Sequence, residues 1–148
     1  MKPLELAKAM LEQARDRLTT AERTHSTGNL PYTVRSSQEC VELSLKAALR
    51  AVGIEYPKRH DVSRVLRRMK ARFPDWFPVE KFAATSKELV ELREPAMYGD
   101  EIRMLSSSAL FKREQAEEVL AKAREVYETS QKLLVSLETR GGELRAQG

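Results

Sequence analysis

Residues 30–53 read LPYTVRSSQECVELSLKAALRAVG, and their spacing decides the fold class. The apolar residues recur every three or four positions, which is the period of an amphipathic helix and not of a strand. Pro31 suits the first turn of such a helix, because its missing N–H would be unpaired there, and Gly53 suits a left-handed end. We therefore predict a helix that ends at about Val52. Its apolar row consists of Val34, Val41, Leu45, Ala48 and Val52, with Cys40 and Leu49 beside it.

Four other segments show the same period on either side of this helix. They span about residues 4–24, 62–73, 79–94 and 111–137. Asp61 is placed to cap the third helix with its carboxylate. Pro95 is expected to end the fourth helix, because the residue before a proline is biased away from helical dihedrals. No segment alternates between apolar and polar residues as a half-buried strand does. The pattern predicts an all-α fold, an up-and-down antiparallel bundle of about five helices.

The composition is that of a single domain. The chain has 148 residues, of which 41% are hydrophobic and 32% are charged, and domains cluster near about 100–150 residues. No run approaches the roughly 18 apolar residues of a membrane span, and residues 1–10 contain no apolar signal segment. We expect a cytoplasmic protein with no membrane partner. We also expect a bundle over residues 1–138 and, because Gly141-Gly142 should end the last helix, a disordered tail over residues 139–148.

The sequence gives no sign of metal or cofactor chemistry. The single cysteine, Cys40, cannot form an intrachain disulfide and falls on an apolar helix face, which indicates a buried thiol in a reducing compartment. One cysteine and two histidines are too few for a structural zinc site. Gly-rich phosphate loops and Ser-His-Asp patterns are absent from the sequence. We therefore expect no cofactor and no metal.

A basic segment stands out against the mild net charge of +4. Residues 58–72 contain seven Lys or Arg and one acid. On a continuous helix Arg64, Arg68 and Arg72 would form one ridge, with Arg67 beside it, and like charges at this spacing repel by about 0.2–0.5 kcal/mol per pair. An anion such as RNA, a nucleotide or an acidic protein surface would relieve this repulsion. The alternative is a solvated face whose acidic partners come from another helix.

A second unusual segment is REPAMYGDE, residues 93–101. It allows two interpretations. The first is a plain helix exit, in which Arg93 pairs with Asp100 or Glu101 and Tyr98 packs over the end of the core. The second is a ligand site that includes Arg93, Tyr98 and Asp100.

Several segments together resemble the HEPN domain family. Residues 37–49, SQECVELSLKAAL, are similar to the family's QAxExxLKALL stretch, and the run from Gly53 through Pro57 to His60-Asp61-Val62 resembles its G…P…HDL junction. Residues 115–120, QAEEVL, resemble the start of the family's last helix. Each piece is short, but their order and spacing over roughly residues 4–137 make the resemblance fairly specific.

The resemblance implies a known chemistry and a departure from it. Many HEPN domains are metal-independent ribonucleases, or derive from them, with an Arg-x4–6-His signature and a composite site built by two protomers. The histidine moves protons and the arginine holds the phosphate charge. Here Arg93 matches the arginine, but Tyr98 stands where the histidine belongs. A tyrosine has an ordinary pKa of about 10 and is a poor base at neutral pH.

The resemblance also implies partners. Small prokaryotic HEPN proteins with Arg-x4-Tyr are often encoded beside a minimal nucleotidyltransferase, in toxin–antitoxin-like pairs. Our leading hypothesis is a non-catalytic homodimeric module that engages nucleotide, RNA or such a nucleotidyltransferase, which could also modify Tyr98. The expected ligand-binding residues are Arg93, Tyr98, Asp100, Arg64, Arg67, Arg68 and Arg72.

The alternative is a divergent metal-independent ribonuclease with a composite dimer site. Its candidate catalytic residues are Arg93, Tyr98 and His60. In an alternating bundle the second and fourth helices end at the same pole, so His60 is expected near Arg93, and His25 at the opposite pole. A histidine just before a capping aspartate can instead serve a turn. A purely structural dimer is the third hypothesis, because a shared fold does not transfer function.

Overall fold

The computed structural model describes the backbone of residues 2–147 and the side chains of residues 2–141. The described part of the chain is all-α, as predicted. Its α-helices are α1 (Pro3–Thr27), α2 (Leu30–Ala51), α3 (Ser63–Arg68), α4 (Val79–Glu91), α5 (Arg93–Tyr98), α6 (Ser107–Leu110) and α7 (Arg113–Gln147). A 3₁₀ turn, η1 (Lys70–Arg72), follows α3. None of the described helices is both long enough and apolar enough to cross a bilayer.

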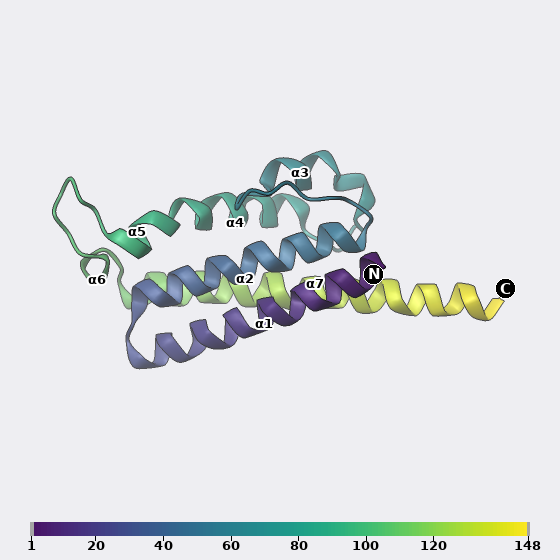
Figure 1. Ribbon diagram of the computed structural model, residues 1–148, viewed down its shortest axis with the longest axis horizontal. Helices are drawn as coiled ribbons and strands as arrows, with labels where there is room; N and C mark the ends of the chain where they lie inside the picture. The colour runs from purple at the N-terminus through teal and green to yellow at the C-terminus, as the bar shows by residue number, and fades with distance from the viewer. Residues whose placement is uncertain (1, 148) are drawn as a thin grey trace.

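Four long helices, α1, α2, α4 and α7, alternate in direction along the chain and form the bundle (Figure 1). Helix α2 packs against α1, α4, α5 and α7. Its apolar row is buried as predicted from Val34 to Ala48, whereas Val52, just after the helix, is half-buried. Leu45 and Leu49 are fully enclosed together with Phe82 and Leu89 of α4 and Leu133 of α7. Asn29 caps α2 by accepting a hydrogen bond from the Tyr32 N–H.

The predicted third helix is shorter than the sequence pattern indicated. Helix α3 ends at Arg68, and the chain then tightens into the 3₁₀ turn. The turn lets the Arg72 guanidinium donate to the Val52 carbonyl at the end of α2. It also brings Phe73 into the core, where its ring stacks on Phe77 with centroids 4.8 Å apart. Tertiary contacts outweigh helical propensity here.

The fourth helix also differs from the prediction. It ends at Glu91, and after Leu92 the chain enters a new short helix, α5, which contains Pro95. Pro95 is the third residue of α5, in its first turn, where no intrahelical N–H is needed. The proline therefore marks a break between two helices and not an exit into a loop.

The last helix runs past its predicted end. Helix α7 extends beyond Leu137 and through Gly141 to Gln147. A glycine in a helix costs only about 1 kcal/mol relative to alanine, so the glycine pair need not end one. The division at residue 138 and the disorder expected of residues 139–148 stay predictions, and residue 148 lies outside the described part of the chain.

The buried thiol of Cys40 supplies a test of this packing. Cys40 is fully buried on α2, and burial raises the pKa of its thiol to about 12. Because the thiolate is the reactive form, we expect the native protein to resist a thiol-reactive dye at pH 8 and to be labelled once unfolded in urea. Mass spectrometry measures the labelled fraction, with Cys40→Ser as the unlabelled control. Rapid labelling of the native protein would contradict the packing around α2.

Candidate functional site

A polar network lies along one face of α2. Gln38 and Glu42 are one turn apart, and the Gln38 side-chain amide donates to Glu42 Oε1 at 3.0 Å. Lys46, one turn further on, donates to Glu42 Oε2 at 3.0 Å. The three side chains form a ladder at i, i+4 spacing, of which Gln38 is 1% exposed and Lys46 9%.

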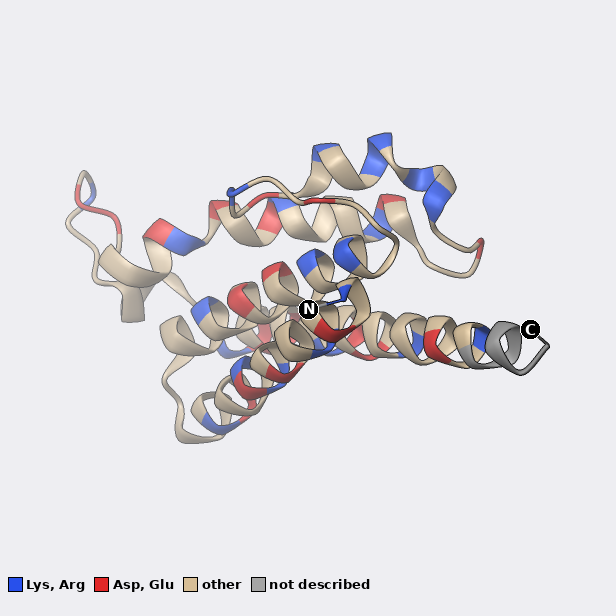
Figure 2. Cartoon of the chain, turned by 45° about the vertical axis from the view of Figure 1, so that its right-hand side comes forward, with Lys and Arg blue, Asp and Glu red and all other residues tan. Residues whose placement is uncertain are grey.

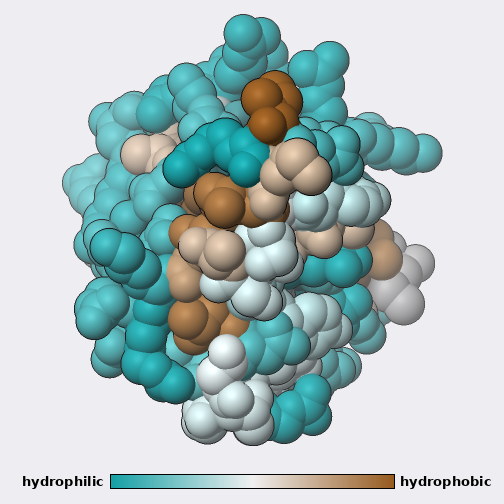
Figure 3. Space-filling view, turned by 90° about the vertical axis from the view of Figure 1, so that its left-hand side faces the viewer, coloured by the Kyte–Doolittle hydropathy of each residue, from teal (hydrophilic) through white to brown (hydrophobic). Residues whose placement is uncertain are grey.

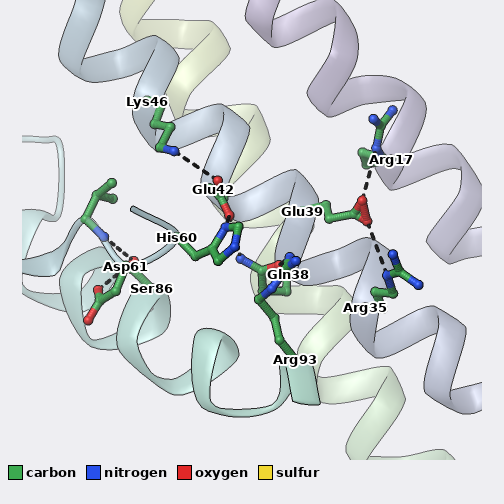
Figure 4. A network of polar contacts seen from close by, with 11 residues as sticks. Arg17, Arg35, Gln38, Glu39, Glu42, Lys46, His60, Asp61, Ser86 and Arg93 are labelled. Carbon is green, nitrogen blue, oxygen red and sulfur yellow. Dashed lines mark hydrogen bonds and ion pairs between the residues drawn. The ribbon is translucent and has the colours of Figure 1, made fainter. Parts of the chain in front are cut away.

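Two residues distant in the sequence join this ladder (Figure 4). Arg93, the first residue of α5, donates from Nη1 to Gln38 Oε1 at 2.5 Å. His60, in the connection between α2 and α3, places Nδ1 at 2.8 Å from Glu42 Oε1. A continuous chain of polar contacts therefore connects Arg93, Gln38, Glu42 and His60.

The carboxylate of Glu42 is the charge at the centre of this network. Its burial by itself would raise its pKa, but hydrogen bonds from Gln38, Lys46 and His60 and the charge of Lys46 together hold the pKa below its ordinary value of 4.5. The charged form is thus the one that the folded protein favours. The Glu42 side chain is only 14% exposed, whereas that of His60 is 55% exposed and faces solvent.

His60 and Arg93 join one network, as expected, but the predicted reason is wrong. Because α3 is short, α4 runs antiparallel to α2 and ends at the opposite pole (Figure 1). His60 reaches the network because the connection after α2 folds back along that helix (Figure 1). His25, at the end of α1, lies at the pole where α2 begins, which is also the pole of α5, and not opposite to it.

The Asp61 carboxylate fastens the connection that carries His60. Its Oδ1 accepts from the Ser63 N–H at 2.9 Å and from the Ser86 hydroxyl at 3.1 Å. The Ser86 hydroxyl oxygen in turn accepts from the Val62 N–H at 3.1 Å. Asp61 therefore satisfies a first-turn donor of α3, as predicted, and also ties the connection to α4.

Tyr98 does not join the network. It is the last residue of α5, and residues five apart on a helix lie about 140° apart around its axis, so Arg93 and Tyr98 face different directions. The side chain of Tyr98 is 64% exposed and lines two hollows. The interpretation in which Tyr98 packs over the end of the core is therefore wrong.

Asp100 shapes a loop and does not pair with Arg93. Its backbone exchanges hydrogen bonds with that of Leu105, each at 2.9 Å, and its Oδ1 accepts from the Arg103 N–H at 3.0 Å. Gly99 begins this loop at φ 73°, and a Cβ there would lie 2.2 Å from the Leu105 carbonyl oxygen. A side chain at position 99 is excluded by this close approach.

The predicted basic ridge is only partly present. Arg64 and Arg68 line one groove of about 510 Å³, together with Arg59 from the connection before α3. Arg67 points elsewhere and pairs with Glu80 at 3.0 Å, and Arg72 is directed to the end of α2. Figure 2 shows Lys and Arg concentrated over α3 and the segment that follows it. The groove is therefore lined by Arg59, Arg64 and Arg68, and Arg72 is not part of it.

Three network residues were not among the candidates drawn from the sequence. Gln38, Glu42 and Lys46 lie in the segment that carries the family resemblance, but that resemblance assigned them no role. The sequence feature that could have identified them is their four-residue spacing, which places three polar side chains in one row on a helix that is otherwise largely buried. Such a run in a buried helix indicates paired polar groups.

Comparisons with known proteins agree with this architecture. The sequence model of the HEPN domain matches residues 7–133. Among solved structures, the crystal structure of TT1696 from Thermus thermophilus superposes with a TM-score of 0.71 at 25% sequence identity. That alignment covers 86% of this chain and 97% of TT1696. A search of curated proteins gives no match.

The lowered pKa of Glu42 predicts how stability depends on pH. Because the folded value lies below 4.5, the charged carboxylate stabilises the fold above pH 4.5, and this contribution is lost as the pH falls through the folded pKa. We expect Glu42→Gln to lower the free energy of unfolding at pH 7 by about 1–3 kcal/mol. The difference from the wild type should shrink below pH 4.5.

Urea unfolding at pH 7, 5, 4 and 3 measures this difference. Glu39→Gln is a matched control on the same helix, because Glu39 contacts Arg17 and Arg35 only at 3.5 and 4.0 Å and is more exposed. It should change the free energy of unfolding by less than about 1 kcal/mol. A Glu42→Gln deficit that grows toward low pH would contradict the network.

Proposed function

The chain belongs to the HEPN domain family, and we propose that it acts as a non-catalytic module that binds the phosphates of RNA or a nucleotide. The observation that carries this proposal is the separation of Arg93 from Tyr98. Arg93 is engaged with Gln38, while Tyr98 stands in the position of the family's histidine and faces another direction. An acid–base catalyst has to be within hydrogen-bond reach of the proton that it moves, on the same side as the phosphate-holding arginine.

The groove of Arg59, Arg64 and Arg68 supports an anionic ligand. None of these three guanidinium groups forms an ion pair within the described part of the chain. Asp61 also lines the groove, but its Oδ1 already accepts two hydrogen bonds. Three arginines around one hollow repel one another, and a phosphate chain that lies between them removes that repulsion.

We further propose that the module works as a homodimer, with a minimal nucleotidyltransferase as its partner in a toxin–antitoxin-like pair. The exposed apolar side chains at the α5 end of the molecule support a protein contact there. Tyr98 is 64%, Ile102 97% and Met104 89% exposed. Figure 3 shows apolar groups gathered on this end, among hydrophilic neighbours. Large exposed apolar side chains of this kind are typical of protein contacts.

A divergent ribonuclease is the second candidate, and a chain of three polar contacts favours it. The chain from Arg93 through Gln38 and Glu42 to His60 brings an arginine and an exposed imidazole onto one network. In that mechanism Arg93 would hold the phosphate and His60 would move the proton, with a second protomer completing the site.

Cleavage of RNA separates the two candidates. With labelled structured RNA and a chelator present, we expect no cleavage by the wild-type protein at high concentration. Arg93→Ala is the matched variant. Cleavage by the wild type that is lost in Arg93→Ala, and that leaves 2′,3′-cyclic phosphate ends, would establish the ribonuclease and overturn the non-catalytic proposal.

Binding of single-stranded RNA tests the basic groove. We expect Arg64→Gln/Arg68→Gln to weaken binding about tenfold and to reduce the slope of log affinity against log salt by about 1–2, because phosphate contacts release counterions. Fluorescence anisotropy at several salt concentrations measures both. Arg67→Gln, on the same helix but paired with Glu80, should bind within about twofold of the wild type. Equal loss in both variants would point to overall charge and not to this groove.

A further inference from the structure

Tyr98 lines two hollows whose other charged lining residues have opposite signs. One, of about 550 Å³, lies between α5, the following loop and the start of α7, and three acidic residues line it: Glu94, Asp100 and Glu101. The other, of about 280 Å³, lies between α5, α6 and the start of α2, and no acidic residue lines it. Its one charged lining residue is Arg35. A phosphate would be repelled from the first hollow and attracted to the second.

Arg35 is available to an anion. It forms an ion pair with Glu39, but the Nε–carboxylate distance of 4.0 Å is too long for a hydrogen bond, and Glu39 also pairs with Arg17. The Nε atom of Arg35 is buried and makes no hydrogen bond within the described residues. The Arg35 side chain is still 38% exposed, so solvent or a ligand can reach the guanidinium. A planar guanidinium with unused donors matches the geometry of a phosphate.

Two aromatic rings accompany this arginine. Tyr32, 42% exposed, and Tyr98, 64% exposed, both line the second hollow. Neither phenol hydroxyl bonds to another described side chain. Exposed rings beside a cation offer a stacking surface for a nucleobase.

The remaining lining residues add polar groups at the same place. Ser107 and Ser108 of α6 and Asn29 before α2 border the hollow. The hydroxyl of the neighbouring Ser106 is used to cap α6, where its oxygen accepts from the Ala109 N–H at 3.3 Å. The hydroxyls of Ser107 and Ser108 form no hydrogen bond with the described residues. Hydroxyls at these positions can donate to phosphate or ribose oxygens.

From these features we propose that the hollow of Tyr32, Arg35, Tyr98 and Ser107 binds a nucleoside monophosphate. Arg35 receives the phosphate, and the base stacks on Tyr98, with Tyr32 beside it. This inference rests on the proposed nucleotide-binding function and gives it a second site, on a different face from the Arg59–Arg64–Arg68 groove. The sequence suggested one ligand site that includes Arg93, Tyr98 and Asp100. In this proposal Tyr98 contacts a ligand without Arg93 and Asp100, because neither of them lines this hollow.

Calorimetric titration with AMP, adenosine and inorganic phosphate tests the site. We expect AMP to bind more tightly than either part alone. Arg35→Gln should weaken AMP binding at least tenfold and leave adenosine binding unchanged, because the guanidinium contacts only the phosphate. Tyr98→Leu should weaken binding of both AMP and adenosine. Circular dichroism melts of each variant establish that it is folded.

Glu94→Gln is the matched control, because it removes a charge from the other hollow beside the same tyrosine. It should bind AMP at least as tightly as the wild type, and a loss would overturn the choice of hollow. Phosphate that binds as tightly as AMP would overturn the nucleotide assignment. No AMP binding by the wild type at millimolar concentration would overturn the site itself.

Variants of the groove of Arg59, Arg64 and Arg68 distinguish a failure of this site from a failure of the proposed function. Arg64→Gln/Arg68→Gln should bind AMP as the wild type does, while Arg35→Gln should bind RNA as the wild type does. AMP binding that is lost with the groove arginines would mean that no second site exists. RNA binding without AMP binding would leave the proposed function intact and remove this site alone.

Discussion

The enclosure of helix α2 is the constraint on which the rest of the structure depends. Helices α1, α4, α5 and α7 pack against it, so its polar side chains cannot all reach water. Gln38 and Lys46 are almost fully buried, and a buried polar group without a partner costs about 1–3 kcal/mol. The carboxylate of Glu42 satisfies both of them at once. This carboxylate stays ionised because three donors surround it.

The same carboxylate connects parts of the chain that the helical pattern alone would leave apart. His60 comes to Glu42 from the connection after α2, and Arg93 reaches Gln38 from α5. Asp61 and Ser86 hold that connection against α4. Arg93 is thus positioned by a structural network, to which it gives one of its five N–H donors.

Tyr98 belongs to a different surface from Arg93. Tyr98 lies where an acidic hollow meets one that carries Arg35, and the loop after it exposes Ile102 and Met104. The lining charges favour a phosphate on the Arg35 side of this ring and oppose one on the other side. The arginine groove over α3 and the aromatic surface at Tyr98 lie apart and form no common reaction centre. This arrangement agrees with the proposal that the protein binds nucleotides or RNA without cleaving them.

The sequence by itself determined the helical class, the bounds of α1 and α2 within a few residues, the burial of Cys40 and the hydrogen bond that Asp61 accepts from the first turn of α3. These features depend on periodicity and on contacts within a few residues, which the linear order contains. Only the tertiary structure decided that α3 ends at Arg68, that Arg72 turns to Val52, and that α4 opposes α2 in direction. It alone showed that Arg93 donates a hydrogen bond to Gln38, 55 residues away in the sequence. It also showed that Tyr98 lines two hollows, one with acidic residues and one with Arg35. Such pairings follow from how amphipathic helices of unequal length pack together, and no local pattern of residues encodes that packing.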